Sequence, residues 1–251
     1  MLIGLLSWSC KDELPEPCDC EGQPEGRICR EIRYDKENYI GYVSYSYGTD
    51  GKLKDKEWFN PSGSDKIASY TYNAAGRLIR EDITFHNRIG FAKWEHAYND
   101  TDSLVRSAYS ENGNLISEYE FEYNPEHLLL KKSLTENGVL TAVFRYSYDE
   151  TGRLWRMEEY EGDGSLDIQR YYTYFSNHTE RVEIYKGETE YLGYDFINRL
   201  TSGEILEIKH YGPNQELKGY LLNDYHGGRI SRTADYDQDS HVKTSTLFVY
   251  Y

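Results

Sequence analysis

The side chains best suited to chemistry in this 251-residue chain are seven histidines and 43 acidic residues. The histidines are scattered, and no two have the His-Glu-x-x-His spacing that places two imidazoles on one helix face to hold zinc. The sequence contains neither a Gly-x-Ser-x-Gly nucleophile turn nor a glycine-rich phosphate loop. With 43 acids some carboxylate pair is always available for glycoside hydrolysis, but no acid stands out from its neighbours. We therefore expect no catalytic residue and no cofactor.

One segment, DYDQDSHV at 235–242, spaces Asp235, Asp237 and Asp239 like the first ligands of a calcium loop. Ser240 stands where such a loop needs glycine, and no glutamate closes the site. The segment also aligns with the turn segments YSENGNL and YEGDGSL. We interpret it as a turn and expect no metal site.

Aromatic side chains are the remaining candidates for binding, and tyrosine dominates them with 26 residues against 8 Phe and 4 Trp. A stripe of tyrosines is either a platform on which sugar rings stack or the core of a repeated structure, and the sequence leaves both open. An exposed aromatic residue that breaks the pattern would favour the platform. The candidates for such a binding residue are Trp58, Trp94 and Trp155.

The aromatic residues recur with a fixed period. The phrase YSYDETGRL (146–154) returns as YSYGTDGKL (45–53) and YTYNAAGRL (70–78), with looser copies at 96–104 and 121–129. Its second aromatic recurs every 25 or 26 residues, apart from one slot that holds Arg199, at Tyr47, Tyr72, Tyr98, Tyr123, Tyr148, Tyr174, Tyr225 and Tyr250. Such a period indicates an array in which each unit buries its apolar face on its neighbours. We predict that these tyrosines form the repeated core.

A second series lies halfway between these tyrosines, at Phe59, Phe85, Tyr109, Leu134, Tyr160, Tyr185, Tyr211 and Tyr236. Each half-period therefore fits a strand of about eight residues and a turn of about four or five. The turns carry Gly, Asn and Asp, which accept tight reversals. In SEYEFEY, Tyr119, Phe121 and Tyr123 alternate with glutamates, as in a strand with one aromatic face and one wet face.

These features predict an all-β domain. It would be an antiparallel meander of about 16–17 strands, built from repeats of about 25 residues. A flat sheet of that size would leave a large aromatic surface in water, and long twisted sheets curl or close. We therefore expect the sheet to curl into an open barrel or a spiral.

The repeated phrase, written YxY(D/N)xxGRL, resembles the YD repeat of the Rhs family, whose long arrays wind into hollow β-shells. The resemblance covers roughly residues 40–251 and is most specific in YSYDETGRL and YTYNAAGRL. The family's toxin-releasing core segment and its toxin domain have no counterpart in these residues. The resemblance therefore implies the repeated sheet and not the encapsulation of a toxin.

The first residues, MLIGLLSWSC, resemble the end of a bacterial lipoprotein signal, in which Cys10 becomes the lipidated N-terminus. The KDE that follows resembles the export tag of surface-exposed lipoproteins of the Bacteroidota. The alternative is a frayed N-terminus with a structural cysteine. We expect a signal remnant at 1–10, an acidic Pro/Gly/Cys linker at 11–29 and the repeat β-domain at 30–251.

Three further cysteines, Cys18, Cys20 and Cys29, lie in the linker. If Cys10 carries lipid, they can form at most one disulfide, in which Cys18 or Cys20 closes a small loop with Cys29. Unpaired thiols are the alternative. A metal site is the weakest reading, because no fourth ligand lies nearby.

The formal net charge of −15 argues against nucleic acid as a partner, because phosphate backbones are bound by clustered Lys and Arg. It also argues against docking on an anionic membrane, so we expect membrane contact through the lipid anchor only. We predict a non-enzymatic outer-membrane or periplasmic lipoprotein, displayed at the cell surface, that binds a glycan or a cell-surface protein. The alternatives are a structural or vestigial part of an Rhs-type toxin system and a glycan-cleaving enzyme.

Overall fold

The computed structural model describes residues 25–250, and their strands form a single antiparallel sheet. The strands are β1 (Ile28–Asp35), β2 (Asn38–Tyr47), β3 (Leu53–Asn60), β4 (Gly63–Tyr72), β5 (Leu78–Phe85), β6 (Phe91–Tyr98), β7 (Leu104–Glu111), β8 (Asn114–Tyr123), β9 (Leu129–Glu136), β10 (Val139–Tyr148), β11 (Leu154–Glu161), β12 (Leu166–Ser176), β13 (Thr179–Lys186), β14 (Glu190–Arg199), β15 (Ile205–Tyr211), β16 (Leu217–His226), β17 (Arg229–Asp237) and β18 (Val242–Tyr250). Residues 25–250 include no helix long and apolar enough to span a membrane. The all-β prediction is confirmed.

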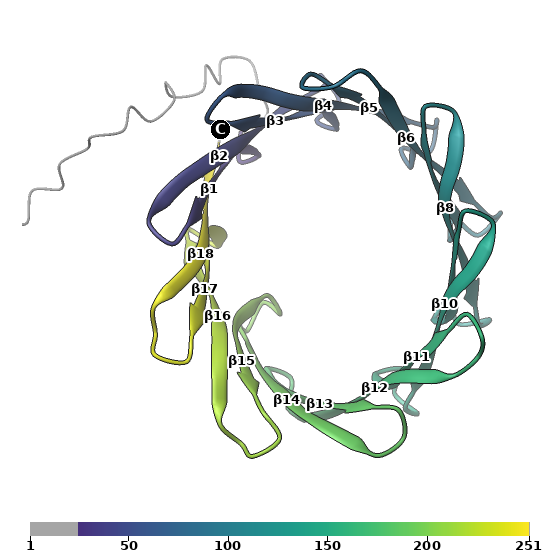
Figure 1. Cartoon of the computed structure of the whole chain (residues 1–251), viewed down its shortest axis with the longest axis vertical. Helices are drawn as coiled ribbons and strands as arrows, with labels where there is room; N and C mark the ends of the chain where they lie inside the picture. Colours follow the sequence, from purple (N-terminus) through teal and green to yellow (C-terminus); the bar gives the residue numbers. More distant parts are fainter. Residues whose placement is uncertain (1–24, 251) are drawn as a thin grey trace, which may run out of the picture.

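Each strand pairs with the strand that follows it in the chain, and β18 pairs back with β1. The closing pair runs from Ile28 opposite Tyr250 to Asp35 opposite Thr244, so the sheet is a closed barrel (Figure 1). The predicted meander is confirmed, whereas the open barrel or spiral is corrected to a closed one with 18 strands. The sequence pattern missed β1, which precedes the first repeat phrase. By pairing with β18, β1 removes the two exposed sheet edges.

Most hairpin turns share one hydrogen-bond pattern. After Tyr148, Asp149 donates its amide to the carbonyl of Arg153 (2.8 Å), and Gly152 donates to the carbonyl of Asp149 (3.0 Å). The Asp149 carboxylate accepts the amides of Thr151 (2.9 Å) and Arg153 (3.0 Å). The fourth turn residue has a positive φ, a conformation that suits glycine, and is Gly51, Gly76, Asp102, His127, Gly152, Gly164, Gly203, Gln215 or Ser240. This pattern explains the Asp or Asn and the Gly of the repeat phrase.

The repeat tyrosines link eight of the nine even-numbered strands, all but β14, to the start of the strand before each. In all eight, the phenol hydroxyl donates to a backbone carbonyl at 2.6–3.0 Å, in the pairs Tyr47–Ile28, Tyr72–Leu53, Tyr98–Leu78, Tyr123–Leu104, Tyr148–Leu129, Tyr174–Leu154, Tyr225–Ile205 and Tyr250–Ile230. The acceptor is the aliphatic residue that ends the preceding copy of the phrase. These tyrosines are half-buried rather than fully buried. Each hydroxyl reaches its carbonyl only if the tyrosine and the acceptor residue keep the same separation along the chain. This requirement explains the constant spacing of the tyrosines in the sequence.

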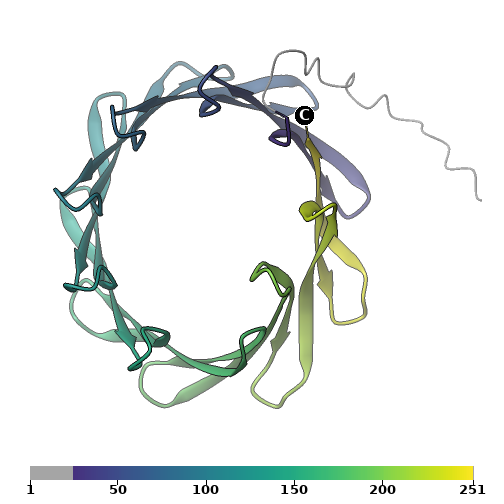
Figure 2. The same cartoon turned by 180° about the vertical axis from the view of Figure 1, so that it is seen from behind.

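Arg199 replaces the tyrosine in the remaining slot. Its guanidinium donates to the carboxylate of Glu180 at 2.7 Å, and Glu180 is only 8% exposed. An ion pair thus stands where the other units use a hydroxyl and a carbonyl. The turn that follows, 200–204, projects toward the middle of the ring (Figure 2).

The barrel wall is a single sheet with small side chains at its most buried positions. These are Cys29, Ile32, Val43, Ala68, Ile83, Ala92, Ala108, Val182 and Ala234. One cluster, Ala68, Ile83 and Ala92, has larger rings packed against it, among them Trp58 and Trp94. Large side chains stay half-buried because no second layer covers them in the described residues.

We call the face that carries the repeat tyrosines the tyrosine face, and the other the opposite face. In β8, Tyr119, Phe121 and Tyr123 are half-buried while Glu120 and Glu122 are exposed, so the predicted alternation is confirmed there. Further round the barrel, cross-strand pairing places rings on the opposite face: Tyr171, Tyr185, Tyr194, Tyr211, Tyr220 and Tyr236. The prediction of one aromatic face and one wet face is wrong for that half.

The second aromatic series does not keep to one face either. Its members Phe85, Tyr109 and Leu134 pair with residues of the tyrosine face. The other members pair with residues of the opposite face: Phe59, Tyr160, Tyr185, Tyr211 and Tyr236. A shift of one residue turns a side chain to the other face, and the turns and β-bulges here differ in length.

Candidate functional site

The three candidate tryptophans have different surroundings. Trp58 and Trp94 lie on the tyrosine face, half-buried against the cluster of Ala68, Ile83 and Ala92. Trp155 is 41% exposed and lies in β11, far from the other two along the sheet. Its ring centre is 6.3 Å from that of Tyr171, on the opposite face. Of the three candidate tryptophans, Trp155 is therefore the exposed one.

Beside Trp155 the opposite face contains a groove of about 470 Å³, which we call the arginine groove. It is lined by residues of β11, β12, the turn between them and the turn between β13 and β14: Arg156, Glu158, Tyr160, Gly164, Leu166, Gln169, Tyr171 and Glu188. Its volume is in the range of small-ligand sites. Most lining residues are polar, and they come from neighbouring strands whose register places them side by side.

A connected set of hydrogen bonds fixes the floor of the arginine groove. The Arg156 guanidinium donates to Glu158 at 2.7 Å and to the side-chain oxygen of Gln169 at 3.0 Å. The Tyr160 hydroxyl donates to Glu158 (2.8 Å), and the Tyr171 hydroxyl donates to Gln169 (2.7 Å). Gln169 is only 3% exposed, and its amide nitrogen donates to the carbonyl of Gly187 at 2.8 Å. The polar groups are thus held in place before any ligand arrives.

Two further features concern the Arg156 guanidinium group. The Nε atom of Arg156 is buried without a hydrogen-bond partner, and an unmet buried donor costs free energy until it finds an acceptor. The guanidinium carbon also lies 5.6 Å from the centre of the Tyr171 ring. Burial, helped by the hydrogen bond to Glu158, raises the pKa of Tyr160. Its one hydroxyl hydrogen is donated to Glu158, so its oxygen is left as an acceptor. Planar polar groups beside an exposed indole suit a hydroxyl-rich ligand with an apolar ring face.

The tyrosine face of β3–β10 carries a second arrangement, which we call the lysine–aromatic face. Its lysines Lys56, Lys66 and Lys132 place their ammonium groups over aromatic rings instead of carboxylates. The nitrogen-to-centroid distances are 5.1 Å for Lys56–Tyr45, 4.9 Å for Lys56–Trp58, 4.6 Å for Lys66–Trp58, 5.2 Å for Lys132–Tyr119 and 4.1 Å for Lys132–Phe144. Such contacts are attractive, because a ring face is electron-rich.

Burial shifts several titrations on this face. It lowers the pKa of Lys56 and raises the pKa of Glu81, because each charged form loses contact with water. Burial also raises the pKa of Tyr45 and of Tyr70, and each tyrosine donates to a carboxylate, Tyr45 to Glu31 and Tyr70 to Glu81. The carboxylates on this face are therefore engaged by phenols.

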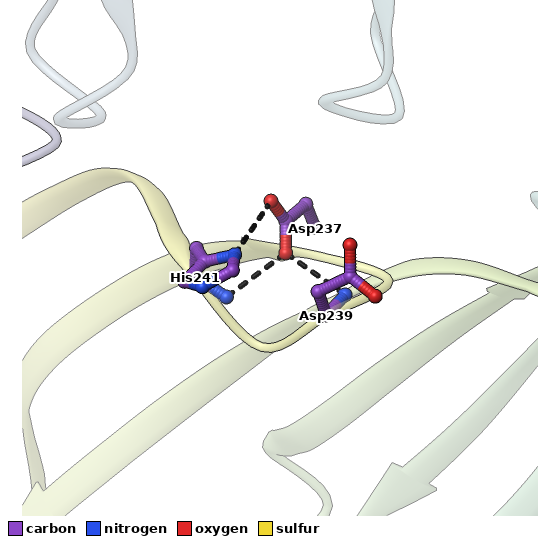
Figure 3. A group of neighbouring side chains, drawn as sticks. All are labelled: Asp237, Asp239 and His241. Carbon is purple, nitrogen blue, oxygen red and sulfur yellow. Dashed lines mark hydrogen bonds and ion pairs between the residues drawn. The ribbon is translucent and has the colours of Figure 1, made fainter.

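The acid-rich turn at 237–241 repeats the shared turn pattern. Asp237 accepts the amides of Asp239 and His241, each at 2.9 Å, and lies 3.4 Å from the His241 ring nitrogen (Figure 3). Asp149 makes the same two amide contacts in its own turn. The hydrogen bond from the His241 amide is the main reason that the pKa of Asp237 is lowered. Oxygen and nitrogen ligands do come together here, but the geometry is that of a turn.

Two serine–histidine contacts escaped the sequence analysis. Ser107 lies 2.8 Å from the ring of His96 on the tyrosine face. Ser64 lies 2.6 Å from His86 and also donates to Glu57 at 2.6 Å. In a nucleophilic triad the histidine stands between the serine and the acid, whereas here Ser64 stands between the other two. Neither contact has the arrangement of a catalytic triad.

The residues of the arginine groove were also missed by sequence reasoning. A signal was present in the adjacent pair Tyr171–Tyr172, because neighbouring strand residues point to opposite faces. Two tyrosines in a row therefore indicate rings on both faces of β12. Arg156, Glu158 and Gln169 carried no comparable signal, since charged residues are frequent on every strand.

The cysteine predictions fall mainly outside the described residues. Cys10, Cys18 and Cys20 lie there, so the lipidation of Cys10 and the pairing scheme stay predictions. Cys29 begins the buried set of β1, with 0% exposure, and is disulfide-bonded.

Comparisons with known proteins support the fold. A family model described as "Uncharacterised protein" matches residues 16–147, slightly more than half of the chain. No curated protein matches the sequence. The structure is similar to a porin-like protein from Bacteroides uniformis ATCC 8492, with a TM-score of 0.51 and 10% identity over 91% of this chain and 100% of that one. At that identity the likeness shows a shared fold alone.

Two further solved structures are more distant. A porin-like protein from Bacteroides vulgatus ATCC 8482 has a TM-score of 0.36 and 10% identity, over 89% of this chain and 98% of that chain. The TcdB2-TccC3-Cdc42 structure has a TM-score of 0.30 and 10% identity, over 85% of this chain and 16% of that one. TM-scores this low support no conclusion about the present chain.

Proposed function

We propose that this chain, which belongs to the family whose model matches residues 16–147, is a non-enzymatic glycan-binding protein. The proposal starts from the geometry of the arginine groove. The observation that carries the proposal is the exposed ring of Trp155 beside the preformed hydrogen-bond network of Arg156, Glu158 and Gln169. The ring offers an apolar surface for the C–H face of a sugar. The network offers donors and acceptors for its hydroxyl groups.

The fixed side chains of the arginine groove suit an uncharged, hydroxyl-rich ligand. Arg156 is already neutralised by Glu158 at 2.7 Å, so the groove does not need a ligand of opposite charge. The nearly buried Gln169 is fixed by three hydrogen bonds and loses little freedom on binding.

The groove favours binding over cleavage. Cleavage of a glycosidic bond needs one carboxylic acid and one carboxylate, and the acid must hold a proton near neutral pH. Glu158 accepts hydrogen bonds from both Arg156 and Tyr160, so its carboxylate is already engaged by two side chains of the groove. This fixed position suits it to hold a ligand hydroxyl group.

Glycan binding is testable with the full-length chain and a panel of hexasaccharides: maltohexaose, cellohexaose, xylohexaose, mannohexaose and N-acetylchitohexaose. We expect calorimetric titration to show saturable binding of at least one of them. Trp155→Ala should weaken that binding by about tenfold or more, since an aromatic anchor contributes roughly 1.5–3 kcal/mol.

The matched control is Leu206→Ala. Leu206 is the second residue of β15, as Trp155 is of β11, and is 36% exposed. Its loss should leave the affinity unchanged. Equal effects of the two substitutions, or no saturable binding at all, would contradict the proposal and favour a structural role. Release of shorter sugars during incubation would show an enzyme instead.

We further propose that the protein is anchored in the cell envelope by lipid on Cys10 and displays the barrel to extracellular or periplasmic glycans. The support is the apolar run before Cys10 and the acidic segment after it. Metabolic labelling with a palmitate analogue in a bacterial host should tag the protein, and Cys10→Ala should abolish the tag. Labelling of both at the same level would refute the anchor without affecting the groove.

A further inference from the structure

The lysine–aromatic face holds three ammonium groups that contact rings and no carboxylate directly. Lys56, Lys66 and Lys132 lie over Trp58 and Phe144, whereas Glu31 and Glu81 act on the charge of Lys56 only at longer range. On the opposite face of nearby strands, lysines do pair with carboxylates, as in Lys93–Glu95 (2.9 Å) and Lys131–Glu122 (2.6 Å). The whole chain has a formal charge of −15, so carboxylates are plentiful. Three half-buried ammonium groups without a direct contact to a carboxylate are therefore unusual in this chain.

Three carboxylates that share this face have partners other than the lysines. Glu31 accepts the hydroxyl of Tyr45, and Glu81 lies 3.4 Å from the hydroxyl of Tyr70. Glu111 pairs with Arg88 at 2.8 Å. An ammonium group has three donors and, when half-buried, makes strong hydrogen bonds to an anionic acceptor. No carboxylate of this face contacts Lys56, Lys66 or Lys132 directly, and a ligand can supply such an acceptor.

The lysines are arranged along the wall and not in one cluster. Lys56 and Lys66 flank the ring of Trp58, on β3 and β4, whereas Lys132 lies on β9. Five steps of about 4.8 Å separate β4 from β9, a path of roughly 24 Å around the barrel. The rings of Trp94, Tyr109 and Tyr119 lie between them, with the Trp94 ring 5.1 Å from Tyr109 and 6.3 Å from Tyr119. Positively charged lysines thus lie at the two ends of this path, and aromatic rings lie between them.

We propose that the lysine–aromatic face binds a linear acidic polysaccharide, one whose sugar units carry carboxylates, laid across the strands from β3 to β10. The carboxylates would pair with Lys56 or Lys66 at one end and Lys132 at the other. The sugar rings between them would contact Trp94 and Tyr119. This surface lies on the other face of the wall from the arginine groove, and the two bind independently.

The test uses the full-length chain with hexagalacturonate as the anionic probe and maltohexaose as its neutral counterpart. At an ionic strength of about 0.01 M, where screening extends over about 30 Å, calorimetry should show binding of hexagalacturonate. The affinity should fall as salt is raised to about 0.15 M. Lys132→Ala should weaken binding about tenfold, and Lys132→Arg should retain most of it, because the cation is kept.

Lys131→Ala is the matched control, because Lys131 is the neighbouring residue and lies on the opposite face, paired with Glu122 at 2.6 Å. It should change the affinity by less than about twofold. Trp155→Ala should also leave hexagalacturonate binding intact, which separates this face from the groove. No binding of hexagalacturonate at low salt, or equal losses for Lys131→Ala and Lys132→Ala, would overturn the proposal. Equally tight binding of a poly-glutamate peptide would overturn the polysaccharide assignment in favour of an acidic protein.

Discussion

Trp94 and Trp155 lie in two halves of the barrel that use aromatic rings differently. Around Trp94, on the tyrosine face of β3–β10, rings lie over small buried residues such as Ala68 and Ala92 and over one another. Around Trp155, on the opposite face of β11–β15, single arginines lie over the rings of Tyr171 and Tyr194. Arg181 lies 4.0 Å from the centre of the Tyr194 ring, which in turn stacks on Tyr211 at 4.7 Å.

The difference shows that the repeat fixes the backbone and leaves the choice of aromatic face free. The hydrogen bond from each repeat tyrosine to a carbonyl of the preceding strand is the same in both halves, at 3.0 Å for Tyr123 and 2.8 Å for Tyr225. This bond holds the strand register. Once the register is held, either face can carry the rings, since both faces of a single wall are partly exposed.

The largest expected effect separates the two tryptophans. Trp94→Ala should destabilise the barrel by about 3 kcal/mol, because removal of a packed aromatic residue leaves a cavity. Trp155→Ala should cost less than about 1 kcal/mol, as expected at an exposed site. Chemical denaturation followed by circular dichroism measures both. Similar losses of unfolding free energy would mean that the two halves are packed alike.

A smaller contrast is expected between neighbours on one strand. Tyr123→Ala should cost about 2–3 kcal/mol, and Tyr123→Phe about 1 kcal/mol, because the latter loses only the hydrogen bond to the carbonyl of Leu104. Glu122→Ala, on the other face, should remain within about 0.5 kcal/mol. The same denaturation experiment applies. Comparable costs at Tyr123 and Glu122 would show that both faces of β8 are buried.

The arginine stacks should contribute more than the lysine contacts. Arg181→Ala removes the cation over Tyr194 and the pair with Glu183 at 2.8 Å, and should cost about 1–2 kcal/mol. Lys132→Ala should cost about 0.5–1 kcal/mol. A larger loss at Lys132 than at Arg181 would show that the lysines are structural and would weaken their assignment to a ligand.

The smallest effect concerns two histidines of the tyrosine face, whose pKa values should be shifted in opposite directions from the ordinary value. Burial lowers the pKa of His96 from its ordinary value of 6.5. The hydrogen bond to Asp195, at 2.7 Å, raises the pKa of His210 above 6.5. Imidazole proton resonances followed by NMR across this range should show His210 titrating at the higher pH. The reverse order would contradict the described environments.

The consequences for stability have opposite signs. The contribution of His210 is fully present below pH 6.5 and is lost as the pH rises through its raised pKa. The contribution of His96 is present above pH 6.5 and is lost as the pH falls through its lowered pKa. His210→Gln should therefore remove part of the loss of stability on the alkaline side and leave the acidic side unchanged.

The sequence by itself determined the strands, their order and their turns. The aromatic period, the Asp or Asn that caps each turn and the residue of positive φ are local features, readable without knowledge of distant contacts. The alternation of Tyr119, Phe121 and Tyr123 with glutamates likewise predicted both faces of β8. The spacing of the tyrosines encoded the ladder of hydroxyl–carbonyl bonds, although their acceptors became visible only in the structure.

Tertiary structure decided the closure, the change of aromatic face and the candidate sites. Closure depends on β1 meeting β18, two segments about 220 residues apart, and no local pattern encodes such a meeting. The face that each ring takes depends on the parity of turns and β-bulges, which one residue is enough to reverse. Nothing in the sequence distinguishes Arg156 or Gln169 from the other charged and polar residues of the strands. They form a groove only because β11 and β12 pair in the register that brings their side chains within 3.0 Å.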